Sequence, residues 1–214
     1  MSVSVEKVAE KVEFYSSKRI LDLVGSISSL IFFTPIYIII SLIILITDGR
    51  PILFRQARVG EGGKTFYIYK FRSMQRNAEK ILQENSDLYE EYVKNDYKFP
   101  EGKDPRITKF GNILRKTSLD ELPQFWNVLM GDMSLVGPRP IVIDELNEYS
   151  SNKIEFLKMK PGITGIWQVS GRSNIQYPER SDLELSYLQY QGLWFDIKIL
   201  LKTIFCVFNK IGAH

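Results

Sequence analysis

The chain has 214 residues, 44% of them hydrophobic and 25% charged, which is enough for one folded domain with an accessory segment and too apolar for a disordered chain. Its net charge of +3 at pH 7 does not by itself identify a partner. The single cysteine, Cys206, excludes a disulfide framework, and the single histidine, His214, excludes a Ser-His-Asp triad. Acid-base or nucleophilic chemistry must therefore use carboxylates, lysines or tyrosines.

Residues 20–48 carry the strongest physical signal in the sequence. From Leu23 to Ile46 there are 24 residues without one charge, which is long enough for a helix that spans a membrane. Thr34 and Pro35 lie in the middle of this run. Because proline removes a helical hydrogen bond and clashes with the preceding turn, we expect a kink there.

Two arguments favour a re-entrant membrane hairpin over a single span. Each half of the run has about 12 residues, or roughly 18 Å of helix, which is shorter than the roughly 30 Å hydrocarbon core of a bilayer. Basic residues also flank both ends, which the positive-inside rule places on the cytoplasmic side; they are Lys18, Arg19, Arg50, Arg55 and Arg58. The Thr34 hydroxyl is expected to bond a carbonyl that Pro35 frees. An ordinary kinked span is the alternative.

Two further segments are candidates for amphipathic helices at the membrane interface. Residues 1–19 carry Val5, Val8 and Val12 at helical spacing, which predicts a short amphipathic helix. Residues 193–211 mix aromatic and aliphatic side chains with lysines, a composition typical of an interfacial helix. For this C-terminal helix, packing against the core is an equally good interpretation.

Residues 49–214 predict one domain of mixed α/β class that is mostly helical and faces the cytoplasm. Within it, residues 52–74 predict a β-hairpin with a glycine-rich turn, and the period of two places Lys70 and Arg72 on one face. Residues 78–98 predict a polar, solvated helix that carries no recognisable chemistry.

Acidic, basic and turn residues are concentrated between residues 104 and 140. Ser118 and Glu121 match a helix capping box, which would give these acids a purely structural role. Alternatively, a helix begins at Pro123 and leaves Asp120 and Glu121 just before its positive end. That dipole favours the ionised carboxylate that a nucleophilic aspartate needs. Adjacent acids also suit Mg²⁺, which shares its remaining ligand positions with substrate phosphates.

A second feature of this region is Arg139, which stands between Pro138 and Pro140. Two prolines restrict the backbone, so the guanidinium is expected to project from a stiff loop. Its planar fork of donors suits a phosphate group.

In these motifs the sequence resembles the monotopic phosphoglycosyl transferases, the bacterial sugar transferases that start exopolysaccharide, capsule and O-antigen repeat units. The resemblance extends from about Lys18 to Ala213. It is carried, in chain order, by KRILD at 18–22, YKFRSM at 69–74, TSLDELPQ at 117–124, GDMSLVGPRP at 131–140 and PGITG at 161–165. Some members of that family carry four additional N-terminal membrane spans, and we expect this chain to be the catalytic unit without them.

The resemblance implies a mechanism and roles for individual residues. Asp120 would attack the β-phosphorus of a UDP-sugar, release UMP and form an aspartyl-phosphosugar, which undecaprenyl phosphate would then accept. Mg²⁺ would lie at Asp120 and Glu121, and the catalytic role of Glu121 would be metal binding or proton management. The phosphate contacts would come from a set of basic residues: Lys70, Arg72, Arg106, Arg115 and Arg139. Each of the first four has an alternative role as an ion-pairing or interfacial residue. The family bends its re-entrant helix at a Ser-Pro pair, which Thr34 and Pro35 replace here with the hydroxyl kept.

The implied location is the bacterial inner membrane, with a monotopic chain whose active site lies on the cytoplasmic face. The expected partners are a UDP-sugar, undecaprenyl phosphate and membrane lipid, and a homodimer is compatible with the sequence. Residues 165–172, GIWQVSGR, resemble the branch that transfers hexose 1-phosphate, which favours UDP-galactose or UDP-glucose over a UDP-N-acetylated amino sugar. A non-catalytic membrane adaptor is the alternative from another class. No nucleic-acid partner is expected, because 25 acids are interspersed among 28 bases.

Overall fold

The computed structural model describes residues 2–95, 99 and 103–208, and it confirms the predicted mixed α/β, mostly helical class. Two small two-stranded sheets lie among the helices. The elements in chain order are α1 (Ser2–Phe32), α2 (Thr34–Thr47), β1 (Leu53–Val59), η1 (Glu61–Gly63), β2 (Thr65–Phe71), α3 (Ala78–Glu84), α4 (Ser86–Lys94), α5 (Lys109–Lys116), η2 (Leu119–Glu121), α6 (Gln124–Met130), β3 (Ser134–Val136), η3 (Asp144–Asn152), α7 (Lys153–Leu157), β4 (Gly162–Thr164), α8 (Ile166–Ser170), η4 (Arg172–Asn174), α9 (Glu179–Tyr190) and α10 (Leu193–Phe208).

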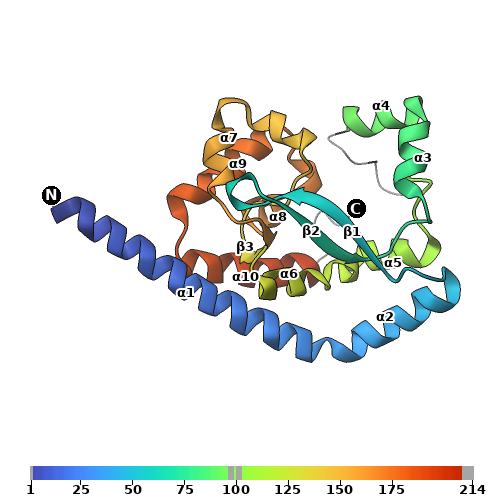
Figure 1. The fold of residues 1–214 in the computed structure, drawn as a ribbon, viewed down its shortest axis with the longest axis horizontal. Helices are drawn as coiled ribbons and strands as arrows, with labels where there is room; N and C mark the ends of the chain where they lie inside the picture. Colours follow the sequence, from blue (N-terminus) through green and yellow to red (C-terminus); the bar gives the residue numbers. More distant parts are fainter. Residues whose placement is uncertain (1, 96–98, 100–102, 209–214) are drawn as a thin grey trace.

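Helices α1 and α2 form a bent pair along one side of the molecule, and the V that they make opens toward the domain (Figure 1). The bend between them is 59°, and it falls at Phe33, directly before Thr34 and Pro35. The Thr34 hydroxyl donates to the Leu30 carbonyl at 2.8 Å. The predicted kink is therefore confirmed. The hydroxyl bonds the Leu30 carbonyl, however, and not the carbonyl of Ile31, which is the one that Pro35 leaves without its helical donor.

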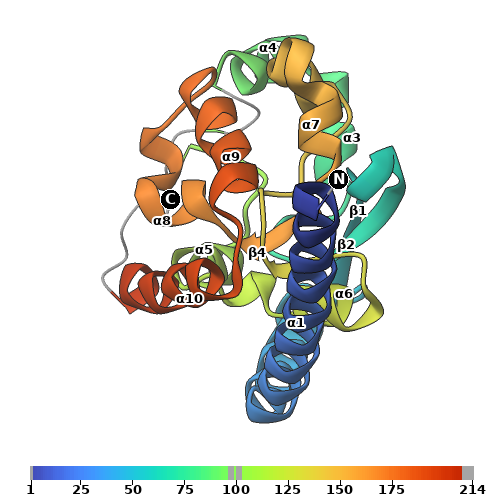
Figure 2. The same ribbon diagram turned by 90° about the vertical axis from the view of Figure 1, so that its left-hand side faces the viewer.

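Among the described residues, no single helix is long and apolar enough to cross a membrane, whereas the bent pair Phe14–Phe32 and Thr34–Thr47 meets the length and composition criteria together. Helix α1 continues from Ser2 into the apolar run without a break at residue 19, and in Figure 2 it projects beyond the domain. The side chains of residues 2–13, on which the predicted amphipathic face depends, lie outside the described part.

Polar side chains of α1 fix the bent pair to the domain. Lys18 is buried and donates to the Asp196 carboxylate of α10 at 2.5 Å. One turn later, the Asp22 carboxylate accepts from the Ser134 hydroxyl at 2.9 Å and from the Leu135 amide at 2.8 Å. The Arg19 guanidinium donates to two carbonyls at the end of α6, at 2.7 and 2.8 Å. Through these contacts α1 holds β3, α6 and α10 together.

The predicted β-hairpin is confirmed. Strands β1 and β2 pair antiparallel from Leu53 opposite Phe71 to Val59 opposite Thr65. The turn between them contains Gly62, whose φ of 68° lies in the left-handed region that glycine adopts without steric strain. Side chains on alternate positions of β2, Phe66 and Ile68, are buried in the main core.

A second sheet joins β3 and β4 in parallel, with Ser134 opposite Gly162. The backbone segments around these two strands approach so closely that a Cβ on Gly137 would lie 2.3 Å from the Lys160 carbonyl oxygen. Only glycine fits this position, and the contact fixes the start of the loop that carries Arg139.

Two apolar clusters form the interior. The larger one joins the β-hairpin with β3 and helices α6 to α10. The smaller one is built from the inner face of α2 together with β2, α5 and the segment around η2; its buried members are Ile40, Ile44, Phe71, Leu114 and Leu122. The segment that contains the acid pair therefore packs directly on the second arm of the bent pair.

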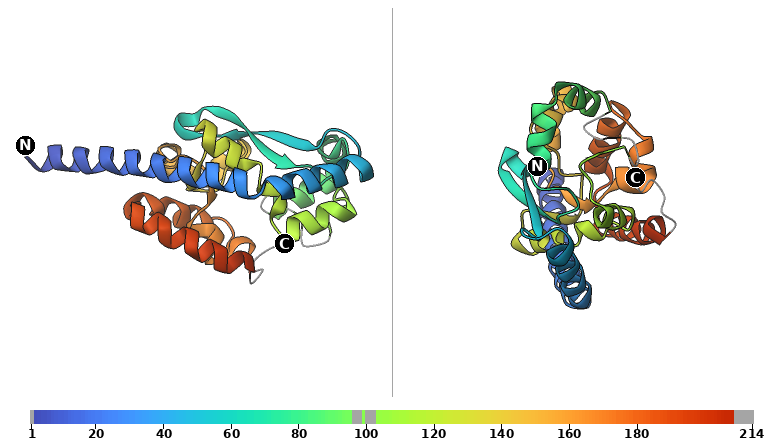
Figure 3. Two further views of the ribbon diagram at one scale, coloured as in Figure 1. Left: turned by 90° about the horizontal axis from the view of Figure 1, so that it is seen from below. Right: turned by 90° about the vertical axis from the view of Figure 1, so that its right-hand side faces the viewer.

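Two predicted helices differ from the structure in extent. The helix expected over residues 78–98 is divided at Asn85, because the Asn85 side chain accepts from the Leu88 amide and starts α4; residues 96–98 lie outside the described part. Helix α10 is described to Phe208, and it supports both interpretations of the C-terminal helix. One face is buried at Ile199 and Cys206, while the opposite face exposes Trp194 and Leu201. Seen from below, α10 lies beside the bent pair (Figure 3).

Candidate active site

The acid pair lies in a short turn between α5 and α6. Asp120 and Glu121 belong to η2, and α6 follows with Pro123 as its N-cap residue. The prediction that a helix starts at Pro123 is confirmed to within one residue. The acids therefore stand directly before the amino-terminal end of α6.

The predicted capping box is not formed. Ser118 adopts a left-handed conformation with φ of 56°, and within the described part of the chain its side chain caps no helix. The Glu121 side chain instead accepts from Lys70. Capping therefore does not account for the two acids.

Asp120 is buried, with only 6% of its surface exposed. Burial has the largest effect and raises the pKa of Asp120 to about 6; the Lys70 charge opposes the rise, Glu121 adds to it and Arg115 opposes it. Burial is thus the main influence on this carboxylate, and the sequence alone did not indicate it. At neutral pH the carboxylate is still mostly ionised, because the pH then lies about one unit above its pKa.

Glu121 is partly exposed and is paired with Lys70 of β2. The Lys70 ammonium donates to the Glu121 carboxylate at 2.6 Å across 51 positions in the sequence. Burial works to raise the pKa of Glu121, but Lys70, followed by Arg139 and Arg172, lowers it below the usual range. Glu121 is therefore anionic, and positive charges from three separate segments act on it.

The charge of Arg115 acts on Asp120, whereas Arg106 is paired with Asp104. The Arg115 guanidinium donates from Nε to the Ser73 hydroxyl at 3.0 Å, and its charge acts directly on Asp120. Arg106 uses Nε and Nη2 for the two Asp104 carboxylate oxygens, each at 2.8 Å, and its side chain is 6% exposed. The structure thus brings Arg115 to the acid pair, whereas Arg106 already has an intramolecular partner.

Arg139 lies in the loop that follows β3, between Pro138 and Pro140. Its backbone amide donates to the buried Glu184 carboxylate at 3.1 Å, and its guanidinium lies 5.6 Å from the centre of the Trp167 ring. Trp167 is itself buried and bonded through its indole N–H to the Ile175 carbonyl, so it packs beneath the arginine. The positive charge of Arg139 reaches Glu121, as the lowered pKa of that acid shows.

Arg72 does not join the acid pair. Strand β2 ends at Phe71, so the alternation that placed Arg72 on the face of Lys70 stops one residue before it. The Arg72 guanidinium is buried and donates to the carbonyls of Asp48 and Gly49, at 2.7 and 2.8 Å. It binds the carboxyl end of α2, which gives it a structural role in the bent pair.

Arg172 is a site residue that the sequence did not single out. It opens η4 with φ of 50°, a left-handed conformation that costs free energy in a residue with a side chain. Its charge contributes to the lowered pKa of Glu121. The only signal in the sequence is the Gly171-Arg172 pair, because glycine allows the tight turn that brings the arginine back toward η2.

The protein supplies only some of the ligands that Mg²⁺ would need at the acid pair. Among the described residues, no three acidic, histidine or cysteine side chains gather into a ready-made metal site. Asp120 and Glu121 offer two carboxylates. Burial destabilises the ionised form of Asp120, so a nearby cation would stabilise it. Because Mg²⁺ commonly takes one or two carboxylates and completes its shell with phosphate oxygens and water, the pair fits an ion that arrives with an anionic substrate.

Taken together, the fold and the site define a class. A buried carboxylate, a second carboxylate and four cations (Lys70, Arg115, Arg139 and Arg172) converge from five segments, on an α/β domain fixed to a bent apolar helix pair. Such an arrangement suits a polyphosphate substrate that is handled beside an apolar phase. The chain belongs to the bacterial sugar transferase family, whose model matches residues 13–210.

Several curated relatives share this family domain. The chain is 46% identical over 200 residues to the undecaprenyl-phosphate galactose phosphotransferase of Salmonella typhimurium, covering 92% of the chain and 41% of the relative. It is 38% identical over 205 residues to the UDP-glucose:undecaprenyl-phosphate glucose-1-phosphate transferase of Escherichia coli, again covering 92% and 41%. It is 38% identical over 207 residues to the exopolysaccharide production protein ExoY of Rhizobium meliloti, covering 92% and 88%. The chain thus spans less than half the length of some relatives and most of the length of others.

Proposed function

We propose that this protein transfers hexose 1-phosphate from a UDP-sugar to undecaprenyl phosphate, through an aspartyl-phosphosugar intermediate, as the first membrane step of polysaccharide assembly. The observation that carries the proposal is the buried Asp120 carboxylate, still ionised at neutral pH, beside cations that suit a diphosphate. The names of the Salmonella typhimurium and Escherichia coli relatives support the same reaction.

In the first half-reaction, a carboxylate oxygen of Asp120 attacks the β-phosphorus of the UDP-sugar. The new bond is an acyl phosphate, and the bond that breaks joins the β-phosphorus to the oxygen bridging the two phosphates. That oxygen leaves with the electron pair as part of UMP. In the second half-reaction, an oxygen of the lipid phosphate attacks the same phosphorus, forms the diphosphate and returns Asp120 to its carboxylate form.

The remaining site residues bind, orient and neutralise. Arg139 and Arg172 offer donors to the phosphate oxygens, and Arg115 holds positive charge beside Asp120. Lys70 keeps Glu121 anionic and fixes its position. Asp120 and Glu121 would hold Mg²⁺, which when bound supplies positive charge against the diphosphate.

The exposed apolar surface of the bent pair supports a membrane location. Phe32 at the bend is 75% exposed and Ile46 near the end of α2 is 82% exposed, and on the domain side Trp194 of α10 is 76% exposed. We propose that α1 and α2 form a re-entrant hairpin in the bacterial inner membrane, with α10 at the interface and the acid pair on the cytoplasmic face. A site held at this depth meets a lipid phosphate and a soluble nucleotide-sugar in their own phases.

The test is UMP release from a panel of UDP-sugars, including galactose, glucose and N-acetylated amino sugars, with Mg²⁺ and undecaprenyl phosphate in detergent. The wild-type protein, Asp120→Asn and Asp132→Asn are compared; Asp132 is an exposed acid of the same region and serves as the matched control. We expect galactose or glucose to support release, Asp120→Asn to lose at least about 1,000-fold and Asp132→Asn to keep wild-type activity. Equal rates in wild type and Asp120→Asn would overturn the assignment of the nucleophile.

A further inference from the structure

The turn that carries the acid pair is only weakly held by its own backbone. The Glu121 amide donates to the Ser118 carbonyl at 3.3 Å, and the Leu122 amide donates to the Leu119 carbonyl at 3.4 Å, both long for hydrogen bonds. The next residue, Pro123, has no amide to donate. The geometry of η2 must therefore be set largely by groups outside it.

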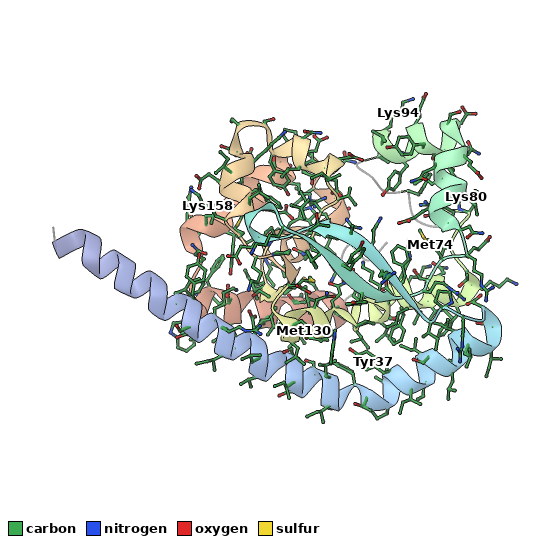
Figure 4. All side chains as sticks on the ribbon, in the orientation of Figure 1. Tyr37, Met74, Lys80, Lys94, Met130 and Lys158 are labelled. Atoms are coloured by element: carbon green, nitrogen blue, oxygen red, sulfur yellow. The ribbon has the colours of Figure 1, made fainter. Side chains whose placement is uncertain are left out.

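One such group comes from the second arm of the bent pair. The Tyr37 hydroxyl of α2 donates to the carbonyl of Leu122 at 2.5 Å. Leu122 is the residue directly after Glu121. Figure 4 shows Tyr37 on the side of the bent pair that faces the domain. The same carbonyl also accepts from the Phe125 amide at 3.1 Å, so Tyr37 ties α2 to the point where η2 passes into α6.

The Tyr37 ring reaches the other side of the site as well. It packs against Phe71 of β2, with 5.6 Å between the ring centres and 51° between their planes. Phe71 follows Lys70, the partner of Glu121. One side chain therefore contacts both the strand that supplies the lysine and the turn that supplies the acids.

We propose that Tyr37 is a positioning residue that couples the membrane hairpin to the acid-pair turn, an inference that rests on the proposed function. The physical reason lies in the surroundings of the hydroxyl. At the edge of an apolar phase, a phenolic hydroxyl without a partner is costly, and little water competes for it. Insertion of α2 therefore favours the bond to Leu122, and that bond holds η2 in the geometry that presents Asp120 to a phosphate.

The experiment compares wild type with Tyr37→Phe in lipid nanodiscs, using Tyr190→Phe as the matched control because Tyr190 is 61% exposed on α9. The phenylalanine keeps the ring packing on Phe71 and removes only the hydroxyl. We expect kcat for UMP release to fall about 3- to 10-fold with KM for the UDP-sugar unchanged, the range expected for one lost hydrogen bond. Hydrogen exchange of the amides at residues 119–122 should accelerate by a similar factor, while exchange in β2 should not change.

The outcomes test the role of Tyr37 and the proposed transferase function separately. Wild-type kcat and wild-type exchange in Tyr37→Phe would overturn the inference. A loss confined to KM, or a chain that fails to fold, would also overturn it, because the hydroxyl would then act in binding or in global stability. If the wild-type protein releases no UMP from any sugar, the proposed function fails, and the exchange measurement still shows whether Tyr37 orders the turn.

Discussion

The buried ion pair between Lys18 and Asp196 provides a sharp test of how the bent pair is fixed to the domain. The Lys18 ammonium donates to Asp196 at 2.5 Å, to the Val136 carbonyl at 2.9 Å and to the Tyr187 hydroxyl at 3.0 Å. The side chains of Lys18 and Asp196 are 11% and 0% exposed. In Lys18→Met, the Asp196 carboxylate keeps the Tyr187 hydroxyl, at 2.7 Å, but loses its counter-charge inside the protein.

Removing one partner of a buried ion pair costs about 3–5 kcal/mol in the free energy of unfolding. For a chain of this size that corresponds to a fall in melting temperature of roughly 6–20 °C, measured in detergent at pH 8. The exposed Lys198 of α10 gives the matched control, since Lys198→Met should change stability by less than about 0.5 kcal/mol. The double variant Lys18→Met/Asp196→Asn should recover most of the loss, because no charge is then left unpaired.

The pH dependence of this loss has a definite sign. Burial already raises the pKa of Asp196, and Lys18 opposes that rise. Without Lys18 the pKa in the folded state rises further above that of the unfolded chain, so the native state gains stability as the pH falls through the new value. The difference in the free energy of unfolding between wild type and Lys18→Met should therefore shrink between pH 8 and pH 5. A Lys18→Met variant that loses less than about 1 kcal/mol, or whose deficit grows at low pH, would refute the reasoning.

Three further predictions follow from the site and its supports. Activity measured as kcat/KM should fall about tenfold per pH unit below pH 6, because the nucleophile is lost as Asp120 takes a proton at a pKa of about 6; a flat profile from pH 7 to pH 5 would contradict this. Gly111→Ala should destabilise the protein by at least about 2 kcal/mol in thermal melting. The reason is that the new Cβ would lie 1.9 Å from the Ser73 carbonyl oxygen. Asn112→Ala, a change at the exposed neighbouring residue, serves as the control. Chelation of Mg²⁺ should abolish UMP release and leave the melting temperature of the substrate-free protein nearly unchanged, which would be contradicted by activity that survives excess chelator.

Features with a local physical cause could be predicted from the sequence. The bend at Thr34 and Pro35 follows from a missing amide, and the hairpin of β1 and β2 follows from alternating residues on either side of a glycine turn. The helix start at Pro123 has the same kind of cause. In each case the residues that decide the structure lie within a few positions of one another.

Features that depend on distant partners could not be predicted. The pairing of Lys70 with Glu121 joins residues 51 positions apart, and no local pattern indicates it. Arg72 matched the pattern of Lys70, but the end of β2 at Phe71 turned it toward the carboxyl end of α2. The raised pKa of Asp120 likewise results from burial by segments that fold around it.

The central claim, that Asp120 carries the phosphosugar, is tested most directly by looking for the intermediate itself. The protein is incubated with Mg²⁺ and the active UDP-sugar but without undecaprenyl phosphate, then digested at low pH and analysed by mass spectrometry. The account predicts up to one equivalent of UMP and a phosphohexose adduct on the peptide that contains Asp120, which disappears when the lipid phosphate is added. UMP release that occurs only with the lipid phosphate present, and no adduct on that peptide, would contradict it.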